Sequence, residues 1–374
     1  DGCYWGEPLF GYYEHGDEWV IRRHAMMLTM ADVDFILFDT TNLTMHRENA
    51  LKVMKIFNEY QQAGWNVPKF AFYTNSEPGK RAQEIYENVY KAEMYPDVWF
   101  RPNGKPLLVG RPEFCSDEVK AFFDIRLTQW PTEHIKKEGA LPWMAFERPQ
   151  FVFVNKDGEN EAMSVSPAQH PQIKFGDSAF HGETQNRGRS FHHAFHTDKN
   201  DAAPGAVDWG YNIAEQWEHA IENDPRMIFV TGWNEWVAGP FKRPEDKERP
   251  VTFIDTASQE YSRDLEPMRG GHFDNYYIQL IDYIRRYKGC TPWPQENSLA
   301  TIDIDGGFDQ WRQVGPAYRG FPFFEIARNH TGMDGRQYVN ESGRHVFDEM
   351  KVAHDGENIY FYAKCFDKIN SYNF

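Results

Sequence analysis

Apolar and polar positions along this chain form two alternating kinds of segment. Short apolar runs occur at residues 9–13 (LFGYY), 33–39, 69–75, 105–110, 142–147, 162–166 and 227–236. Stretches with helical spacing of apolar residues lie between or after them, at 18–31, 48–64, 79–95, 116–130, 213–223 and 275–289. Continuous apolar strands followed by helices are typical of a parallel sheet that is covered on its faces.

The pattern predicts a (β/α)8 TIM barrel over residues 1–290, in the α/β fold class. The apolar runs number one fewer than such a barrel needs, so we expect its first strand to lie upstream of Asp1 or to be irregular. An open doubly wound sheet is the alternative. It is disfavoured because no GxGxxG or GxxxxGKS/T motif follows any run, and these motifs mark nucleotide-binding folds.

The chain changes character after Cys290. Residues 291–298 (TPWPQENS) form a proline-containing linker, and residues 299–374 show no helical periodicity. The stretch MKVAHDGENIYFYAK (350–364) predicts two strands joined at Asp355-Gly356, which is a strong hairpin signal. We expect an incomplete β-sandwich here, because a complete one takes about 100 residues.

Composition and charge exclude several classes of protein. The 374 residues are 41% hydrophobic and 16% aromatic, which suits a large folded core. The net charge of −16, without a basic cluster, argues against nucleic acid and anionic membranes as partners. No apolar run is long enough to span a membrane. The 4 cysteines lie far apart and form no metal-binding spacing. The oligomeric state stays open.

Polar and aromatic side chains follow most of the predicted strands. They include Tyr13, Asp39, Asn75, Glu147, His170, Trp233, Asn234, Glu235 and Trp236. No single residue is decisive, because Asp and Asn are also common helix caps and turn formers. Their recurrence favours a site, because the carboxyl ends of barrel strands converge on the face that carries the active site.

Carboxylates among aromatic platforms suit carbohydrate chemistry. Glycosidic cleavage needs one carboxyl group as the acid and a second as base or nucleophile, while Trp and Tyr rings stack on sugars. The sequence therefore predicts a glycosidase that acts on a poly- or oligosaccharide and needs no cofactor. We expect Glu235 to be catalytic, with Tyr13, Asp39, Asn75, His170, Trp233, Asn234 and Trp236 around the substrate.

Three stretches resemble the glycoside hydrolase family 99-like group, which includes endo-α-mannosidases and the WbsX polysaccharide-biosynthesis proteins. They are GWNEW (232–236) after a buried run, VDFILFDTTN (33–42) and GYY (11–13). The resemblance implies a (β/α)8 barrel that acts on α-linked glycans. In the family pattern NEWxEG, the first Glu assists the substrate 2-hydroxyl and the second is the general acid/base. Glu235 matches the first, but Ala238 stands where the second should be.

The missing acid must therefore come from elsewhere, if there is one. We predict Glu147 or Glu266; the loop at 251–277 also offers Asp255, Glu260, Asp264 and Asp274. A non-catalytic glycan-binding protein and a WbsX-like biosynthetic protein are the alternatives. The first is made credible by Ala238.

The histidines do not predict a metal site. His192, His193 and His196 lie close in sequence, with His170 and His181 upstream, but no ligand set is complete. The segment DIDGGFDQW (303–311) likewise lacks the spacing of a calcium loop.

The end of the chain carries a second resemblance. Its IDGGFDQW and KVAHDGENIYFYAKCFD stretches resemble the family 9 carbohydrate-binding module and its DOMON-like relatives, which often follow bacterial glycosidases. We expect a secreted or periplasmic protein that degrades polysaccharide, with the signal peptide outside this sequence.

Overall fold

Parallel strands form the centre of the molecule, as the apolar runs predict. The structure, a computed structural model, describes residues 3–171, 186–192, 198–237, 239–248, 250–253, 258–295, 299–343 and 345–369. A five-stranded parallel sheet has the order β2-β3-β4-β5-β6. Its strands are β2 (Phe35–Asp39), β3 (Lys69–Tyr73), β4 (Leu107–Gly110), β5 (Asp124–Gln129) and β6 (Ala140–Pro142).

A second sheet has the order β11-β8-β7 and continues the wall. In it β8 (Asn160–Val165) and β11 (Met227–Val230) are parallel, and β7 (Phe153–Val154) is antiparallel to β8. β8 also approaches β6. No strand ladder joins β11 back to β2 in the ranges that the structure describes. The architecture is thus a mixed α/β fold with a curled parallel sheet, open between β2 and β11.

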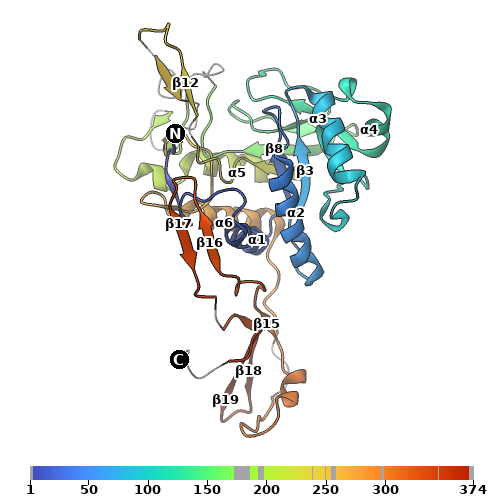
Figure 1. The fold of residues 1–374 in the computed structure, drawn as a ribbon, viewed down its shortest axis with the longest axis vertical. Coiled ribbons are helices and arrows are strands. Elements are labelled where there is room, and N and C mark those ends of the chain that lie inside the picture. Colours follow the sequence, from blue (N-terminus) through green and yellow to red (C-terminus); the bar gives the residue numbers. More distant parts are fainter. Residues whose placement is uncertain are drawn as a thin grey trace.

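Helices cover the outside of this wall (Figure 1). They are α1 (Glu18–Met30), α2 (Arg47–Gln62), α3 (Pro78–Ile85), α4 (Asp117–Phe122), α5 (Tyr211–Asn223) and α6 (Asn275–Lys288). Short π and 3-10 turns add η1 (Tyr86–Tyr90), η2 (Pro96–Val98), η3 (Pro112–Phe114), η5 (Ala206–Asp208) and η6 (Phe308–Gln313). Among the described helices, none has the length and apolar character needed to cross a bilayer.

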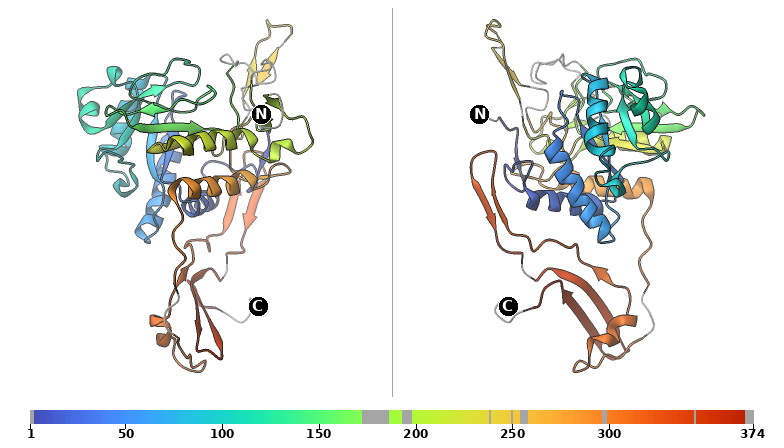
Figure 2. Two further views of the ribbon diagram at one scale, coloured as in Figure 1. Left: turned by 180° about the vertical axis from the view of Figure 1, so that it is seen from behind. Right: turned by 45° about the vertical axis from the view of Figure 1, so that its right-hand side comes forward.

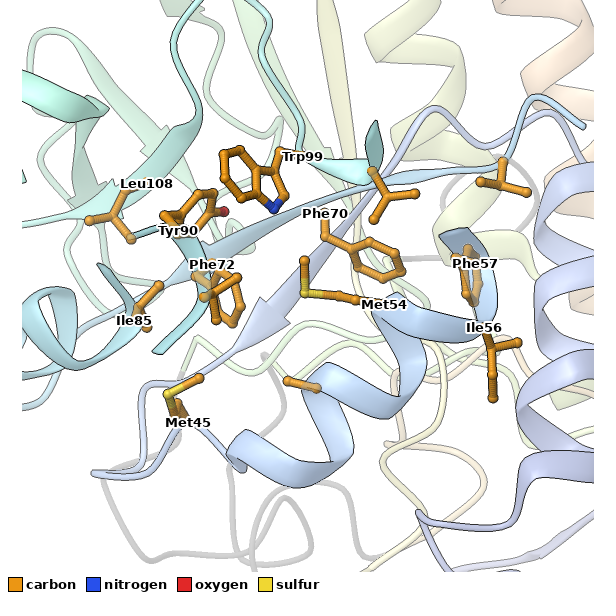
Figure 3. Close-up of a cluster of buried hydrophobic side chains, with 14 of the residues drawn as sticks. Met45, Met54, Ile56, Phe57, Phe70, Phe72, Ile85, Tyr90, Trp99 and Leu108 are labelled. Atoms are coloured by element: carbon orange, nitrogen blue, oxygen red, sulfur yellow. The ribbon is translucent and has the colours of Figure 1, made fainter. Parts of the chain in front are cut away.

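The apolar faces of the helices explain where they pack. In Figure 3, Met54 and Phe57 of α2 lie against Phe70 and Phe72 of β3, and all four side chains are buried. Burying a side chain of this size contributes about 2 kcal/mol. Helices α5 and α6 lie side by side (Figure 2, left) and pack onto β8 and β11. This confirms the helices predicted at 18–31, 48–64, 213–223 and 275–289 within a few residues.

The prediction of one helix over residues 116–130 is wrong. Helix α4 ends at Phe122, and strand β5 follows at once, paired with both β4 and β6. The sequence of β5, DIRLTQ, alternates polar and apolar residues, which is the period of a strand. Pairing on both sides satisfies its backbone and overrides the local helical spacing.

The prediction of a strand at residues 9–13 is also wrong. This segment forms turns, and the strand before it, β1 (Glu7–Pro8), pairs antiparallel with β14 (Met268–Arg269). The prediction of a strand at 142–147 is wrong as well, since β6 shares only Pro142 with that range and no strand continues to residue 147. The wall therefore has no regular strand where the barrel would begin, which leaves β2 with one unpaired edge among the described residues.

Further short strands lie around the wall. They are β9 (Phe191–His192) with β10 (Lys199–Asn200), and β12 (Pro240–Lys242) with β13 (Val251–Phe253), each pair antiparallel. The β12–β13 hairpin projects from the body in Figure 1.

The region after the predicted linker contains two separate sheets. Strands β15 (Tyr318–Arg319), β18 (Phe347–His354) and β19 (Ile359–Cys365) form one, and β16 (Arg328–Thr331) and β17 (Gln337–Asn340) form a hairpin. The hairpin predicted at Asp355-Gly356 is confirmed as the β18–β19 turn, where Gly356 has a φ of 97°. Two facing layers of a sandwich stay a prediction.

The β16–β17 hairpin docks on the start of the chain. Arg328 Nε donates to Asp17 Oδ2 at 2.7 Å, and both side chains are buried. Gly11 adopts a φ of 80°, and a Cβ there would lie 2.3 Å from the Tyr338 ring, so glycine permits both the turn and the close approach. Tyr338 Oη accepts a hydrogen bond from Tyr12 N at 3.0 Å. The hairpin thereby holds the segment that carries Tyr13.

We expect Tyr338→Phe to lower the free energy of unfolding by about 1 kcal/mol, because the Tyr12 N–H loses its acceptor while the ring still packs. Urea denaturation measures the change. Tyr318→Phe is the matched control, since this side chain is exposed on β15 and its loss should change stability by less than about 0.5 kcal/mol. Equal midpoints for the two variants would show that the hairpin does not stabilise the fold.

Candidate active site

A cavity of about 820 Å³ lies between β2 and β11, where the wall is open. Its lining includes side chains along the whole length of both strands. It extends from Asp34 and Arg226, before the strands, to Asp39 at the end of β2 and Glu235 beyond β11. The interior is apolar, with Phe35 and Phe229 in contact at 5.3 Å between ring centroids. The polar groups of interest lie at the carboxyl ends of the strands.

Residues 263–266 run beside the end of β11 and take the place of a strand there. Gly232 N donates to Arg263 O at 2.7 Å, Leu265 N donates to Gly232 O at 3.3 Å, and Glu266 N donates to Trp233 O at 3.0 Å. This backbone pairing brings the side chains of 263–266 next to those of 232–236. The loop predicted at 251–277 therefore does reach the Glu235 strand.

Glu235 is fixed by its backbone, and 52% of its side chain is exposed. Its N–H donates to Asp264 Oδ1 at 2.7 Å, and its carbonyl accepts from Trp5 Nε1 at 2.9 Å. Arg263 Nη2 lies 3.8 Å from Glu235 Oε2. The carboxylate thus lines the cavity beside a cation and is accessible to solvent.

Glu266 lies at the centre of a buried network and is 0% exposed. Tyr13 Oη donates to its Oε2 at 2.7 Å, Trp236 Nε1 donates to the same oxygen at 2.5 Å, and His24 Nε2 lies 2.7 Å from Oε1. Both carboxylate oxygens are therefore engaged. Burial, with the charge of Glu266, raises the pKa of Tyr13 well above its ordinary value.

The network extends to the motif around Glu235 through one further bond. Asn234 Nδ2 donates to Tyr13 Oη at 3.0 Å. Trp236 is 5% exposed, and Trp5 stacks on it with ring centroids 4.4 Å apart. The structure thus brings Tyr13, Asn234, Glu235, Trp236 and Glu266 together, and it places Trp236 beneath Trp5.

Asp264 is 1% exposed and lines the cavity beside Gly232. Its Oδ1 accepts the Glu235 N–H, while its Oδ2 has no hydrogen-bond partner among the described residues. Burial raises the pKa of Asp264 to about 6. A carboxyl group in this state holds a proton in mildly acidic solution.

The other predicted residues are more scattered. Asp39 lines the cavity, is exposed, and accepts from Thr41 N at 2.8 Å. Trp233 lines the cavity and meets the His24 ring edge-on at 5.6 Å. His170 is buried, and its Nδ1 lies 2.9 Å from Arg263 Nη1, so it contacts the guanidinium group of Arg263.

Glu147 and Asn75 do not line the cavity. Glu147 Oε1 lies 2.6 Å from the exposed His134 Nδ1. Asn75 follows β3 and is half-buried.

No group of three or more His, Cys, Asp or Glu side chains suited to a metal ion occurs in the part of the chain that the structure describes. His192 packs edge-on against Tyr211 with centroids 4.1 Å apart. His181, His193, His196, Ala238 and Asp255 lie outside the described residues.

Comparisons with known proteins give structural neighbours alone. No family model matches the sequence, and no curated protein matches it. The chain is similar in structure to a GH99 endo-α-mannosidase from Bacteroides thetaiotaomicron bound to BIS-TRIS-propane, with a TM-score of 0.47 and 14% identity over 76% of this chain and 89% of that one.

Two further neighbours are more distant. Another structure of the Bacteroides thetaiotaomicron GH99 endo-α-mannosidase has a TM-score of 0.44 and 14% identity, over 76% of this chain and 84% of that one. A glycoside hydrolase-like protein has a TM-score of 0.33 and 11% identity, over 75% of this chain and 90% of that one.

The sequence did not predict the site residues that reach Glu235 only through contacts between distant segments of the chain. Trp5 lies before the first predicted strand, and Arg263 is one basic residue in an acidic loop. Arg189, which binds the loop through Asp264 O at 2.6 Å and Ser262 Oγ at 2.9 Å, falls in a stretch without strand or helix periodicity. Asp264 is one of several acids in the 251–277 loop. Nothing in the local sequence separates it from them.

Proposed function

We propose that this protein is a glycoside hydrolase that cleaves an α-linked glycan, with Glu235 as a catalytic carboxylate. The observation that carries the proposal is the position of Glu235 in the segment that follows β11, half exposed, lining a cavity of about 820 Å³ and held in place through its backbone. Glycosidases need such a carboxylate at the substrate, and a rigid strand end gives it a fixed direction.

The surroundings of Glu235 suit a sugar. Trp233 and Tyr13 line the same cavity and offer aromatic faces, and Arg263 offers N–H donors beside the carboxylate. In the proposed reaction Glu235 accepts a proton from the attacking water. The resemblance of GWNEW (232–236) to the family 99-like motif favours an α-linked substrate, and α-mannan is the first one to test.

A glycan-binding protein without turnover is the second candidate. Ala238 occupies the position of the motif's usual acid, and Glu266 has both oxygens engaged by buried donors. If no other group supplies a proton, the same cavity would bind a sugar and leave it intact.

Incubation of the unmodified chain with α-mannan, α-glucan and other α-linked polysaccharides tests the proposal, with release of reducing ends as the readout. Affinity electrophoresis on the same polysaccharides measures binding in parallel. We expect at least one of them to be cut. A protein that binds several and cuts none is a binding protein, and the hydrolase proposal then fails.

A further inference from the structure

One residue beside Glu235 is a candidate for the second acid that the sequence motif lacks. Of the acids that the sequence predicts for the site, Glu266 has both carboxylate oxygens engaged, and Glu147 does not line the cavity. Asp39 lines the cavity but is exposed. Asp264 differs from all three because it lines the cavity, is buried, and keeps one oxygen without a hydrogen-bond partner in the described ranges.

We propose that Asp264 is the general acid that partners Glu235, donating its proton to the leaving oxygen of the glycan. This proposal rests on the glycosidase function argued above. In this role the two oxygens of the side chain act differently, since Oδ1 holds the Glu235 backbone and Oδ2 carries the proton.

The separation of the two carboxyl groups fits this chemistry. Asp264 Oδ1 is 2.7 Å from Glu235 N. With ordinary bond lengths, a Glu carboxylate oxygen lies no more than about 6 Å from its own backbone nitrogen, so the two carboxyl groups are within about 9 Å of each other. Glycosidase pairs lie about 5 to 9.5 Å apart. Asp264 is therefore near enough to protonate the leaving oxygen of the bond at which Glu235 activates water.

The charges around Asp264 leave it able to hold a proton. Burial raises its pKa to about 6, and the Glu266 carboxylate acts in the same direction, while the Glu235 N–H and the guanidinium groups of Arg189 and Arg263 act in the opposite direction. Tyr13 also faces Asp264, and the charge of Asp264 contributes to the raised pKa of Tyr13. Because the shift is upward, the acid form prevails below about pH 6 and is lost as the pH rises through that value.

The step balances with water as the second reactant. The glycosidic carbon–oxygen bond breaks, and the leaving oxygen takes the Asp264 proton and departs as an alcohol. Water adds its hydroxyl group to the anomeric carbon and gives its other proton to Glu235. One proton returns from Glu235 to Asp264 through solvent, which restores both groups.

Asp264→Asn tests the proposal, because the amide keeps Oδ1 as an acceptor for the Glu235 N–H and removes the acidic proton. The probes are α-mannan and 2,4-dinitrophenyl α-mannoside, whose leaving group needs no proton. We expect kcat on α-mannan to fall about 10²-fold, and kcat on the aryl glycoside to fall less than about 10-fold. The fall of kcat/KM above about pH 6 on α-mannan should disappear in the variant.

Asp274→Asn is the control, since this residue is exposed in the same loop at the start of α6 and makes no side-chain capping bond. Equal losses on both probes would make Asp264 a positioning residue and overturn the proposal. An Asp39→Asn variant that abolishes the fall of kcat/KM above about pH 6, while Asp264→Asn keeps it, would also overturn the proposal. A chain that cuts neither these probes nor the other α-linked polysaccharides at any pH would instead reject the glycosidase function itself.

The unmodified protein supplies a test if the variant does not fold. On α-mannan its kcat/KM should fall as the pH rises above about 6. On 2,4-dinitrophenyl α-mannoside its kcat/KM should show no such fall. If kcat/KM falls above about pH 6 on both probes, the group that titrates is not the general acid, and the proposal fails.

Discussion

Glu235→Gln should lower kcat on a cleaved α-glycan by about 10³- to 10⁴-fold, the largest catalytic effect that we expect from this site. The amide has the shape of the carboxylate but accepts no proton, so the attacking water loses its base. Glycan binding should change less than about 3-fold, because the backbone contacts of Glu235 to Asp264 and Trp5 do not involve its side chain.

Initial rates and calorimetric titration with the same oligosaccharide measure the two quantities. Glu222→Gln makes the same chemical change at an exposed position on α5 and should leave both unaltered. A Glu235→Gln protein with kcat within about 10-fold of the unmodified chain would remove Glu235 from the mechanism.

Glu266→Ala should lower the free energy of unfolding by about 3 to 5 kcal/mol, because it leaves Tyr13 Oη, Trp236 Nε1 and His24 Nε2 buried beside a cavity without their acceptor. Activity should fall as well, since Asn234 and the segment around Tyr13 lose their shared anchor. Glu266→Gln keeps one acceptor oxygen and should recover part of the loss.

Urea denaturation of the variants tests this second expectation. Glu147→Ala is the matched control for stability, because Glu147 contacts the exposed His134 and its removal should cost less than about 1 kcal/mol. If Glu266→Ala and Glu147→Ala lower stability equally, the buried network does not hold the site together.

Local periodicity was enough to predict the elements with one clear apolar face. Helices α2, α5 and α6 and strands β2, β3 and β11 lie where the apolar spacing places them, and the β18–β19 hairpin turns at Asp355-Gly356. In each case neighbouring residues carry the signal. Strand β5 was missed because aromatic residues at 122–123 gave its start a helical spacing, and the neighbours that make it a strand are β4 and β6.

For the site, the sequence by itself determined which polar and aromatic residues follow β11. It placed Asn234, Glu235 and Trp236 directly after a buried strand, and it put Ala238 where a second acid would stand. The motif is contiguous in the sequence, so it can be recognised from a single stretch, although contacts to Asp264 and Trp5 hold Glu235 in place.

Only the tertiary structure distinguishes the two acids that lie next to the Glu235 segment. Asp264 and Glu266 are two residues apart, yet one has an oxygen without a partner in the described ranges and the other is surrounded by donors from the start of the chain and from β11's end. The reason is physical: desolvation and hydrogen bonding set the state of a carboxyl group, and both depend on what packs against it. Its neighbours in space include Arg189, far along the chain, and no local pattern records them.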